Sequence, residues 1–347
     1  MRWHNLAGFT AAAAVMSACT PAPQSDWSLT PQESGVTASL RGLSVVDDDI
    51  VWIGAPDGQV LQTRDGGANW QVRTVALAQG ADLRSAHAFD DQRALFVTAG
   101  QPARIIETRD GGASFRLVWE DETGAAFFDS LAFWDAERGL AFSDPVDGVF
   151  LVLRTLDGGL TWQGLEVGPV PLESEAGFAA SNSSIGLTPD GCAFIGTGGG
   201  AVARILRTCD FGDTWDARET PMAAGSAGAG IFAVSIGPDD GLALSGGDYQ
   251  APQDPAGNFA YSRDRGETWQ TSEMPPLGYR SDLAALGDSW LAVGTTGVDI
   301  GVRAGTGFRW QASGWDIPAP NAIAVSPSGQ TAWIIGAGGG IWRVEPK

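Results

Sequence analysis

The sequence predicts an all-β fold, a seven-bladed β-propeller built from four-stranded blades. Three observations predict it: a turn motif recurs five times, a short apolar strand recurs seven times, and the 329 residues after position 18 divide into seven units of 47. Four-stranded units of about 40 to 50 residues, repeated along a chain, are typical of propellers. The many glycines (48) and tryptophans (14) also favour short strands and tight turns.

The recurring turn motif is Ser/Thr-x-Asp-x-Gly-x-x-Trp, with Phe115 in the tryptophan position of the second copy and a sixth copy at 305–310 that lacks the Asp. Its carboxylate can accept backbone N–H groups, its glycine permits positive φ, and its ring packs the turn onto the sheet. The motif resembles the Asp-box, or BNR repeat. We interpret its aspartates as structural turn residues rather than metal ligands or catalytic groups: Asp65, Asp110, Asp157, Asp210 and Asp264.

A second element, a short apolar strand that ends in a small residue, precedes each turn motif. The seven copies end at Gly54, Thr98, Ser143, Gly196, Ser245, Gly294 and Gly336. A shorter alternating strand lies before each copy, so one unit has four strands, with the Asp-box between the third and the fourth. The seventh unit stops at its third strand, 341–344, and we expect residues 27–29 to supply its fourth. The predicted propeller domain is 26–347, and closing the ring in this way leaves no open edge.

The N-terminus predicts export. Arg2 precedes a short apolar run, 6–14, and the sequence Met-Ser-Ala before Cys19 resembles the lipobox of bacterial lipoproteins. We expect a signal peptide at 1–18, lipidation of Cys19 and a tether at 19–25, with plain secretion as the alternative. The protein would then lie on the periplasmic face of a bacterial membrane and contact the membrane through its lipid alone.

The two cysteines of the propeller also bear on this prediction. Cys192 and Cys209 flank two predicted strands around a glycine-rich turn, which would place them nearly opposite each other. In an oxidising compartment we expect a cross-strand disulfide, and two buried free thiols are the alternative.

Composition excludes several classes of function. Acidic residues outnumber basic ones 41 to 21, for a formal net charge of −20, so the chain lacks the basic footprint of a nucleic-acid binder. A hydrophobic content of 44% excludes a disordered acidic tail. His87 is the one histidine after the signal segment; we expect it to be a packed channel residue. Neither a metal site nor a cofactor is expected.

We expect a binding site on the propeller face opposite the Asp-boxes, where longer loops meet the starts of the inner strands. Counting back thirteen or fourteen residues from the end of each second strand gives one residue per blade: Arg41, Arg84, Asp129, Ser183, Ile231, Arg280 and Ala322. Three of these are arginines, whose planar guanidinium groups bind carboxylates bidentately. They predict an anion receptor at one mouth of the channel. The alternative is that each arginine pairs with a neighbouring acid and only joins the blades.

Other residues complete the predicted site. Asp129 and Asp144 would orient the arginines or bind backbone amides, and Ser183 would lie with them. Tyr249 and Tyr279 would supply flat contact area for a partner.

The Asp-boxes and the blade unit at 40–54 resemble the photosystem II assembly factor family Ycf48/Hcf136, over residues 30–347. Uncharacterised bacterial relatives of that family, often loosely labelled oxidoreductases, are similar at 128–135, 143–148, 196–199, 246–249 and 278–281. The resemblance implies a seven-bladed scaffold that holds a polypeptide while a membrane complex assembles. We therefore expect a monomeric, exported propeller that binds a protein or peptide of an envelope complex. The sequence has no flavin or dinucleotide glycine fingerprint that would support the oxidoreductase label.

The alternative is a glycoside hydrolase of sialidase-like or β-glucanase-like type that uses the same cavity, because Asp-boxes also occur in those enzymes. Its catalytic residues would be Asp129, Glu175 and Tyr249, with the three arginines binding a substrate carboxylate. The Phe/Tyr-Arg-Ile-Pro motif of sialidases is absent from the sequence. The sequence favours the binding protein over the enzyme.

Overall fold

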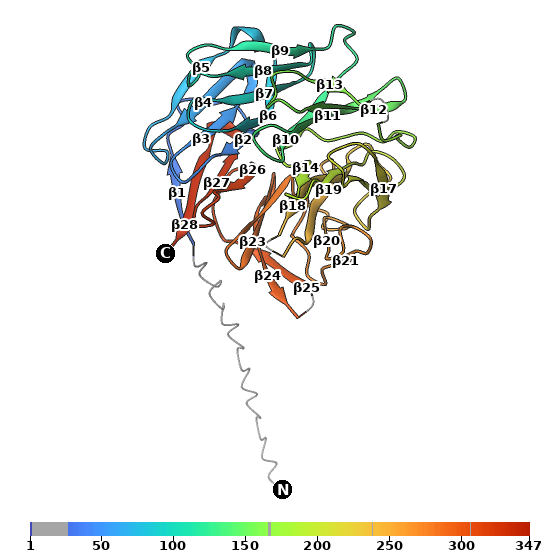
Figure 1. Ribbon diagram of the computed structural model, residues 1–347. Helices are drawn as coiled ribbons and strands as arrows, with labels where there is room; N and C mark the ends of the chain where they lie inside the picture. Colours follow the sequence, from blue (N-terminus) through green and yellow to red (C-terminus); the bar gives the residue numbers. More distant parts are fainter. Residues whose placement is uncertain (2–26, 166–167, 238, 306) are drawn as a thin grey trace.

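The computed structural model describes Met1 and residues 27–347, apart from 166–167, 238 and 306. The predicted signal peptide, Cys19 and the tether lie outside these described residues. Seven four-stranded antiparallel sheets are arranged as the blades of a ring (Figure 1). The first strand of each blade lies against the first strands of the two adjacent blades, which closes the ring around a central channel. The predicted seven-bladed, all-β architecture is confirmed.

The strands of the first four blades follow, from the inner strand outward. They are β2 (Gly42–Val45), β3 (Val51–Gly54), β4 (Gln59–Thr63) and β5 (Gln71–Thr74); β6 (Asp82–Ala88), β7 (Ala94–Ala99), β8 (Arg104–Thr108) and β9 (Arg116–Glu120); β10 (Phe128–Phe133), β11 (Gly139–Val146), β12 (Val149–Thr155) and β13 (Gln163–Gly164); β14 (Ile185–Leu187), β15 (Ala193–Gly196), β16 (Arg204–Thr208) and β17 (Asp216–Glu219).

The remaining three blades and the short helical turns complete the chain. They are β18 (Ala229–Ile236), β19 (Leu242–Asp248), β20 (Phe259–Ser262) and β21 (Gln270–Thr271); β22 (Asp282–Leu286), β23 (Ser289–Gly294), β24 (Gly297–Ala304) and β25 (Gly307–Ala312); β26 (Pro320–Val325), β27 (Ala332–Gly336), β28 (Ile341–Pro346) and β1 (Trp27–Gln32); and the 3-10 turns η1 (Pro56–Gly58), η2 (Ala76–Ala78) and η3 (Ala337–Gly339). No helix in the described part of the chain is long and apolar enough to cross a membrane.

The N-terminal strand closes the ring as the sequence predicts. β1 is the outer strand of the seventh blade and pairs with β28 over its whole length, from Trp27 opposite Pro346 to Gln32 opposite Ile341. Both ends of the described propeller therefore leave from the same side of the blade (Figure 1).

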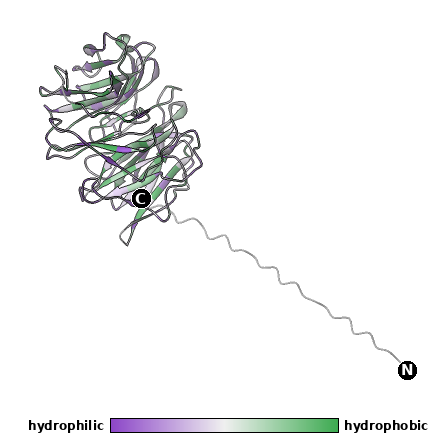
Figure 2. Cartoon of the chain, turned by 90° about the vertical axis from the view of Figure 1, so that its right-hand side faces the viewer, coloured by the Kyte–Doolittle hydropathy of each residue, from purple (hydrophilic) through white to green (hydrophobic). Residues whose placement is uncertain are grey.

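The second strand of each blade forms the core. The strands β3, β15 and β27 are buried along their full length, because neighbouring blades pack on both of their faces. The outer strands β5 and β13 are mostly exposed. Hydrophobic colouring accordingly runs along the strands inside the blades (Figure 2).

Each Asp-box closes the turn between the third and fourth strands by bonds within the turn itself. In the first box, Thr63 Oγ1 donates to Asp65 Oδ1 at 2.9 Å, and the backbone N–H of Asn69 donates to the same oxygen at 2.9 Å. Gly67 donates to Thr63 Oγ1 at 2.9 Å and has φ of 86°. Hydrogen bonds of this kind, first from the side chain and then the backbone of Thr268, lower the pKa of Asp264 in the fifth box to about 2.

These turns define two faces of the propeller. We call the side with the Asp-boxes the box face. The opposite side, where the second strands end and the inner strands begin, is the loop face. The predicted disulfide is present: Cys192 and Cys209 are bonded beside the ladder pair Ala193↔Thr208 of the fourth blade.

Candidate ligand-binding site

A pocket of about 370 Å³ opens at the centre of the loop face. Its walls come from six of the seven blades and from the long connection between the third and fourth blades. The residues that matter for its chemistry are Arg41, Arg84, Asp129, Asp144, Phe178, Phe232, Tyr249 and Tyr279. Its size lies within the range of small-ligand and side-chain pockets in proteins.

Four of the inner strands carry a β-bulge where they line this pocket. The register shifts between the two neighbours of Arg84, Asp129, Phe232 and Asn321. A bulge leaves one residue out of the ladder and re-aims its side chain. All four of these residues line the pocket, so the bulges turn them toward the central opening.

The connection between the third and fourth blades runs into the central channel. Ala179 O and Ala180 O accept hydrogen bonds from Arg84 Nη1 at 3.3 Å and from Arg41 Nη1 at 2.8 Å. Deeper in the channel, the Asn182 side chain accepts from the backbone N–H of Ala86 at 2.9 Å and donates to its carbonyl at 2.8 Å. These partners lie in the first and second blades, neither of which the connection joins. The segment 177–183, which we call the channel segment, therefore forms one wall of the pocket.

Of the channel segment, the sequence predicted only Ser183 as a site residue, and residues 177–180, which line the pocket, were not predicted. The one available signal was the length of the connection, about twenty residues between strands that other blades join more briefly. Its path depends on hydrogen bonds to distant blades, which no local pattern encodes.

The two arginines of the pocket form a cationic pair. Arg84 Nε donates to Asp82 Oδ2 at 2.7 Å, whereas Arg41 has no ion-pair partner among the described residues. Burial, together with the neighbouring charge of Arg84, lowers the pKa of Arg41. Two neighbouring guanidinium groups, of which only that of Arg84 has an ion-pair partner among the described residues, favour an anionic ligand, although the whole chain carries a formal charge of −20.

The two pocket aspartates lie in surroundings that disfavour their charged forms. Burial, reinforced by the neighbouring Asp144, raises the pKa of Asp129 well above its usual range, and burial also raises the pKa of Asp144. Asp144 Oδ1 accepts from the backbone N–H of Gly177 at 2.8 Å. Neither carboxyl oxygen of Asp129 has a hydrogen-bond partner within the described residues. Both shifts favour the protonated acids, so these carboxyl groups oppose the charge of the arginines less than exposed aspartates would.

An aromatic wall stands beside the arginines. The rings of Phe178 and Phe232 stack with centroids 3.9 Å apart, and Tyr279 meets Phe232 edge-on at 4.8 Å. Tyr249 also meets Phe232 edge-on and is 49% exposed at the rim. This wall can receive an apolar or aromatic side chain next to an anionic group.

The structure separates Arg280 from the other two arginines, so the predicted trio is not formed. Arg280 is 2% exposed and its Nε donates to Asp299 Oδ2 at 2.9 Å, away from the pocket. The next residue, Ser281, lines the pocket instead. A shift of one residue turns a strand side chain to the opposite face, which explains the difference. Arg280 instead pairs with a neighbouring acid, Asp299, which is the alternative that the sequence offered for each arginine.

Other expected residues also lie away from the pocket. Ser183 donates to Asp282 in the channel, and Glu175 is a buried partner of Arg204. The count along the inner strands gave Ile231 and Ala322, whereas Phe232 and Asn321 line the pocket.

His87 packs between aromatic rings, with the ring centroids of Phe89 and Phe133 each 4.7 Å away. Burial lowers the pKa of His87 to about 4. Among the described residues, no group of three His, Cys, Asp or Glu side chains could hold a metal ion.

Comparisons with known proteins agree with this architecture. The model of the BNR/Asp-box repeat matches residues 260–271, which include the fifth Asp-box. No curated protein matches the sequence. A solved structure described as Ycf48 bound to D1 peptide has a TM-score of 0.68 at 18% identity, covering 94% of this chain and 99% of that one. Ycf48 from Cyanidioschyzon merolae has a TM-score of 0.66 at 16% identity, covering 92% and 99%.

Enzymes share the fold as well. A catalytically inactive virginiamycin B lyase from Staphylococcus aureus with quinupristin has a TM-score of 0.68 at 15% identity, covering 92% of this chain and 99% of that one. A GH74 xyloglucanase from Xanthomonas campestris has a TM-score of 0.59 at 15% identity, covering 84% of this chain and 50% of that one. At these identities the likeness concerns the fold. The chain carries a BNR/Asp-box repeat at 260–271 and shares the seven-bladed propeller fold with the two Ycf48 structures.

Proposed function

We propose that the protein is a scaffold that binds a polypeptide segment in the central pocket of its loop face and thereby assists the assembly or stability of an envelope complex. The observation that carries the proposal is the cationic pair of Arg41 and Arg84 beside an aromatic wall, in a chain that is otherwise strongly acidic. The structural likeness to Ycf48 bound to D1 peptide supports it.

The channel segment indicates how the pocket would hold a peptide. Its carbonyl oxygens at Ala179 and Ala180 accept from the two arginines, and the Phe178 ring stacks on Phe232. The pocket thus already binds backbone carbonyls and an aromatic ring of its own chain. An incoming segment would use the remaining guanidinium N–H groups for a carboxylate and would lay an apolar side chain near the exposed Tyr249.

Export and lipidation at Cys19 remain part of the proposal. Trp27 begins β1 opposite Pro346, at the end where the third strands run into the box face. Cys19 precedes Trp27 by eight residues, which span at most about 28 Å when fully extended. A lipid at Cys19 would therefore hold the box face toward the membrane, and the pocket would open away from it.

The experiment is site-specific photo-crosslinking. A photoreactive phenylalanine analogue at position 249, on the pocket rim, is expected to capture one polypeptide segment in native membranes, identified by mass spectrometry. The double substitution Arg41→Ala and Arg84→Ala should abolish that crosslink. Arg218→Ala, on the outer strand β17, serves as the control and should leave it unchanged. Equal crosslinking by the wild type and the double variant would refute the proposed site.

A glycoside hydrolase remains the second candidate, because Asp129 and Asp144 are two carboxyl groups with raised pKa values in one pocket. Paired carboxyl groups with separated roles are what glycoside hydrolysis requires. Against it, Gly177 covers Asp129 so closely that an added Cβ would lie 2.2 Å from Asp129 Oδ2. Hydrolysis of a xyloglucan or sialoside that Asp129→Asn abolishes would establish the enzyme instead.

A further inference from the structure

The disulfide of the fourth blade is accessible from one side. Cys192 is fully buried, whereas Cys209 is exposed. Cys209 lines a surface hollow of about 420 Å³ whose wall includes Trp215 and Asp216. A thiol arriving from solution would therefore reach Cys209 first. Accessible disulfides, unlike buried ones, are those that take part in exchange.

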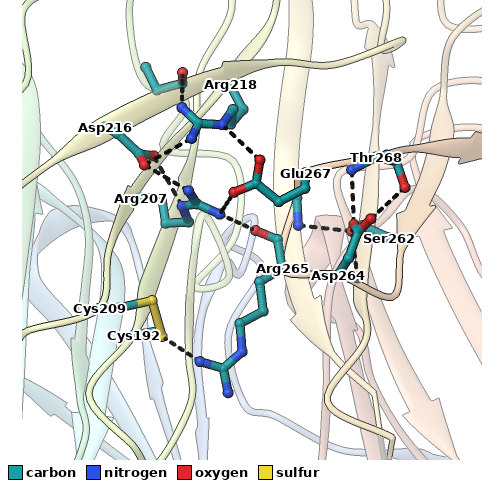
Figure 3. A network of polar contacts seen from close by, with 12 residues as sticks. Cys192, Arg207, Cys209, Asp216, Arg218, Ser262, Asp264, Arg265, Glu267 and Thr268 are labelled. Carbon is teal, nitrogen blue, oxygen red and sulfur yellow. Dashed lines mark hydrogen bonds and ion pairs between the residues drawn. A yellow bond between two sulfur atoms is a disulfide. The ribbon is translucent and has the colours of Figure 1, made fainter.

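A cation lies next to the buried sulfur. Arg265, from the Asp-box of the fifth blade, places Nη1 3.3 Å from Cys192 Sγ (Figure 3). The same guanidinium pairs with Asp190 Oδ2 at 2.7 Å, which holds it in place on the fourth blade. A neighbouring guanidinium stabilises a thiolate and lowers the pKa of its thiol, and a thiol of low pKa is the better leaving group in exchange.

Arg265 occupies a backbone position that glycine takes in other boxes. Its φ is 59°, and the corresponding residues Gly66, Gly111 and Gly158 have φ of 65°, 67° and 71°. A residue with a Cβ is disfavoured in this left-handed region. Phe211, at the same position of the fourth box, also departs from glycine, so the conformation alone does not single out Arg265. What distinguishes Arg265 is its contact with a sulfur atom.

We propose that the Cys192–Cys209 disulfide is a thiol–disulfide exchange site for a dithiol, in which Cys209 is attacked and Cys192 is the leaving group beside Arg265. A thiolate of the dithiol forms a bond to Cys209 Sγ while the bond between the two cysteines breaks. Cys192 leaves as a thiolate. The second thiol of the dithiol then loses its proton and displaces Cys209. The dithiol is oxidised to a disulfide, and the protein gains two electrons and two protons as two thiols. The site lies apart from the loop-face pocket and does not rest on the function proposed for it.

The blade should survive this reaction. The strands β15 and β16 remain joined by four ladder pairs, from Ala193↔Thr208 to Gly196↔Ile205, and β16 also pairs with β17. Reduction therefore frees the two sulfurs without removing the strands from the sheet. Arg265 loses no partner other than the sulfur, because Asp190 still pairs with it.

The test uses the intact oxidised protein with reduced glutathione as the probe. Samples are quenched with acid, and peptide mass spectrometry locates the mixed disulfide and the free thiol. We expect glutathione on Cys209 and a free thiol at Cys192. Arg265→Gly introduces the residue that three other boxes carry, so the fold should be retained. It should slow the exchange at least threefold, and Arg265→Lys should restore most of the rate.

Arg218→Gln is the matched control, since Arg218 lies in the same network but contacts Asp216 and Glu267 rather than sulfur (Figure 3). It should exchange at the wild-type rate. Three results would each overturn the proposal. They are glutathione on Cys192, equal exchange rates for wild type and Arg265→Gly, and exchange that is no faster than global unfolding. Two free thiols in the purified protein would overturn it as well.

Discussion

Removing the charge of Arg280 should strongly destabilise the fold. Arg280 and Asp299 have side-chain exposures of 2% and 1%, and Arg280 Nε donates to Asp299 Oδ2 at 2.9 Å. Arg280→Met keeps most of the side-chain volume but leaves the Asp299 carboxylate buried without its counter-ion. Removing one partner of such a pair costs about 3–5 kcal/mol.

The assay is urea unfolding at pH 7, followed by tryptophan fluorescence, for a double-mutant cycle. Arg280→Met alone should lower the free energy of unfolding by about 3–5 kcal/mol. Asp299→Asn, added to it, removes the stranded charge and keeps an oxygen acceptor for the backbone N–H of Leu277, which donates to Asp299 Oδ2 at 2.8 Å. The double variant should recover more than half of the loss. A loss below about 1 kcal/mol for Arg280→Met, within the range of exposed pairs, would refute the reasoning.

Three further outcomes are expected. Burial raises the pKa of Asp282 to about 7, so between pH 4 and pH 7 the folded state holds a proton that the unfolded chain has released. The free energy of unfolding should therefore fall as the pH rises from 4 to 7. The slope of this free energy against pH should be smaller for Asp282→Asn. Asp264→Ala removes the acceptor of the backbone N–H of Thr268 in the fifth box and should cost about 1–2 kcal/mol in urea unfolding, while Thr268→Val should cost less. Replacing Cys192 and Cys209 together by serine removes a cross-link over 17 residues and should cost about 3 kcal/mol in the same assay, and an unchanged midpoint would contradict that account.

The fold could be predicted from the sequence because its information is local and repeated. Each Asp-box carries its own hydrogen bonds, such as those of Thr63 to Asp65, and so forms the same turn wherever it occurs. The closing strand β1 was predictable for a different reason: the seventh unit lacks a fourth strand, and a ring leaves one place for the missing partner.

The site was predictable in part. A fixed count along the inner strands identified Arg41, Arg84 and Asp129, which do line the pocket. It failed for Arg280, because the side chain one position further along, Ser281, is the one that faces the opening. A bulge adds a residue to some inner strands and not to others, so one count back from the end of the second strand does not fit every blade. An error of one residue is enough to reverse the side that a side chain faces.

The channel segment lay beyond sequence reasoning for another reason. Its position depends on contacts of Asn182 with Ala86 and of Ala180 with Arg41, which are separated by about 100 residues or more along the chain. Such contacts leave no periodic trace in the sequence. The raised pKa of Asp129 is likewise a result of burial, with Gly177 packed against its carboxyl group, which only the assembled pocket reveals.

The central claim is that Arg41 and Arg84 together receive an anionic group of a bound polypeptide. The most direct test is the dissociation constant of the segment captured at position 249, measured by calorimetry for the wild type and for the Arg41→Ala, Arg84→Ala variant. Loss of charged hydrogen bonds worth about 1.5–3 kcal/mol each predicts affinity at least tenfold weaker. Replacing the acidic residues of the segment by their amides should weaken binding to the wild type and have little effect on the variant. Equal affinities of the two proteins for the acidic segment would contradict the account.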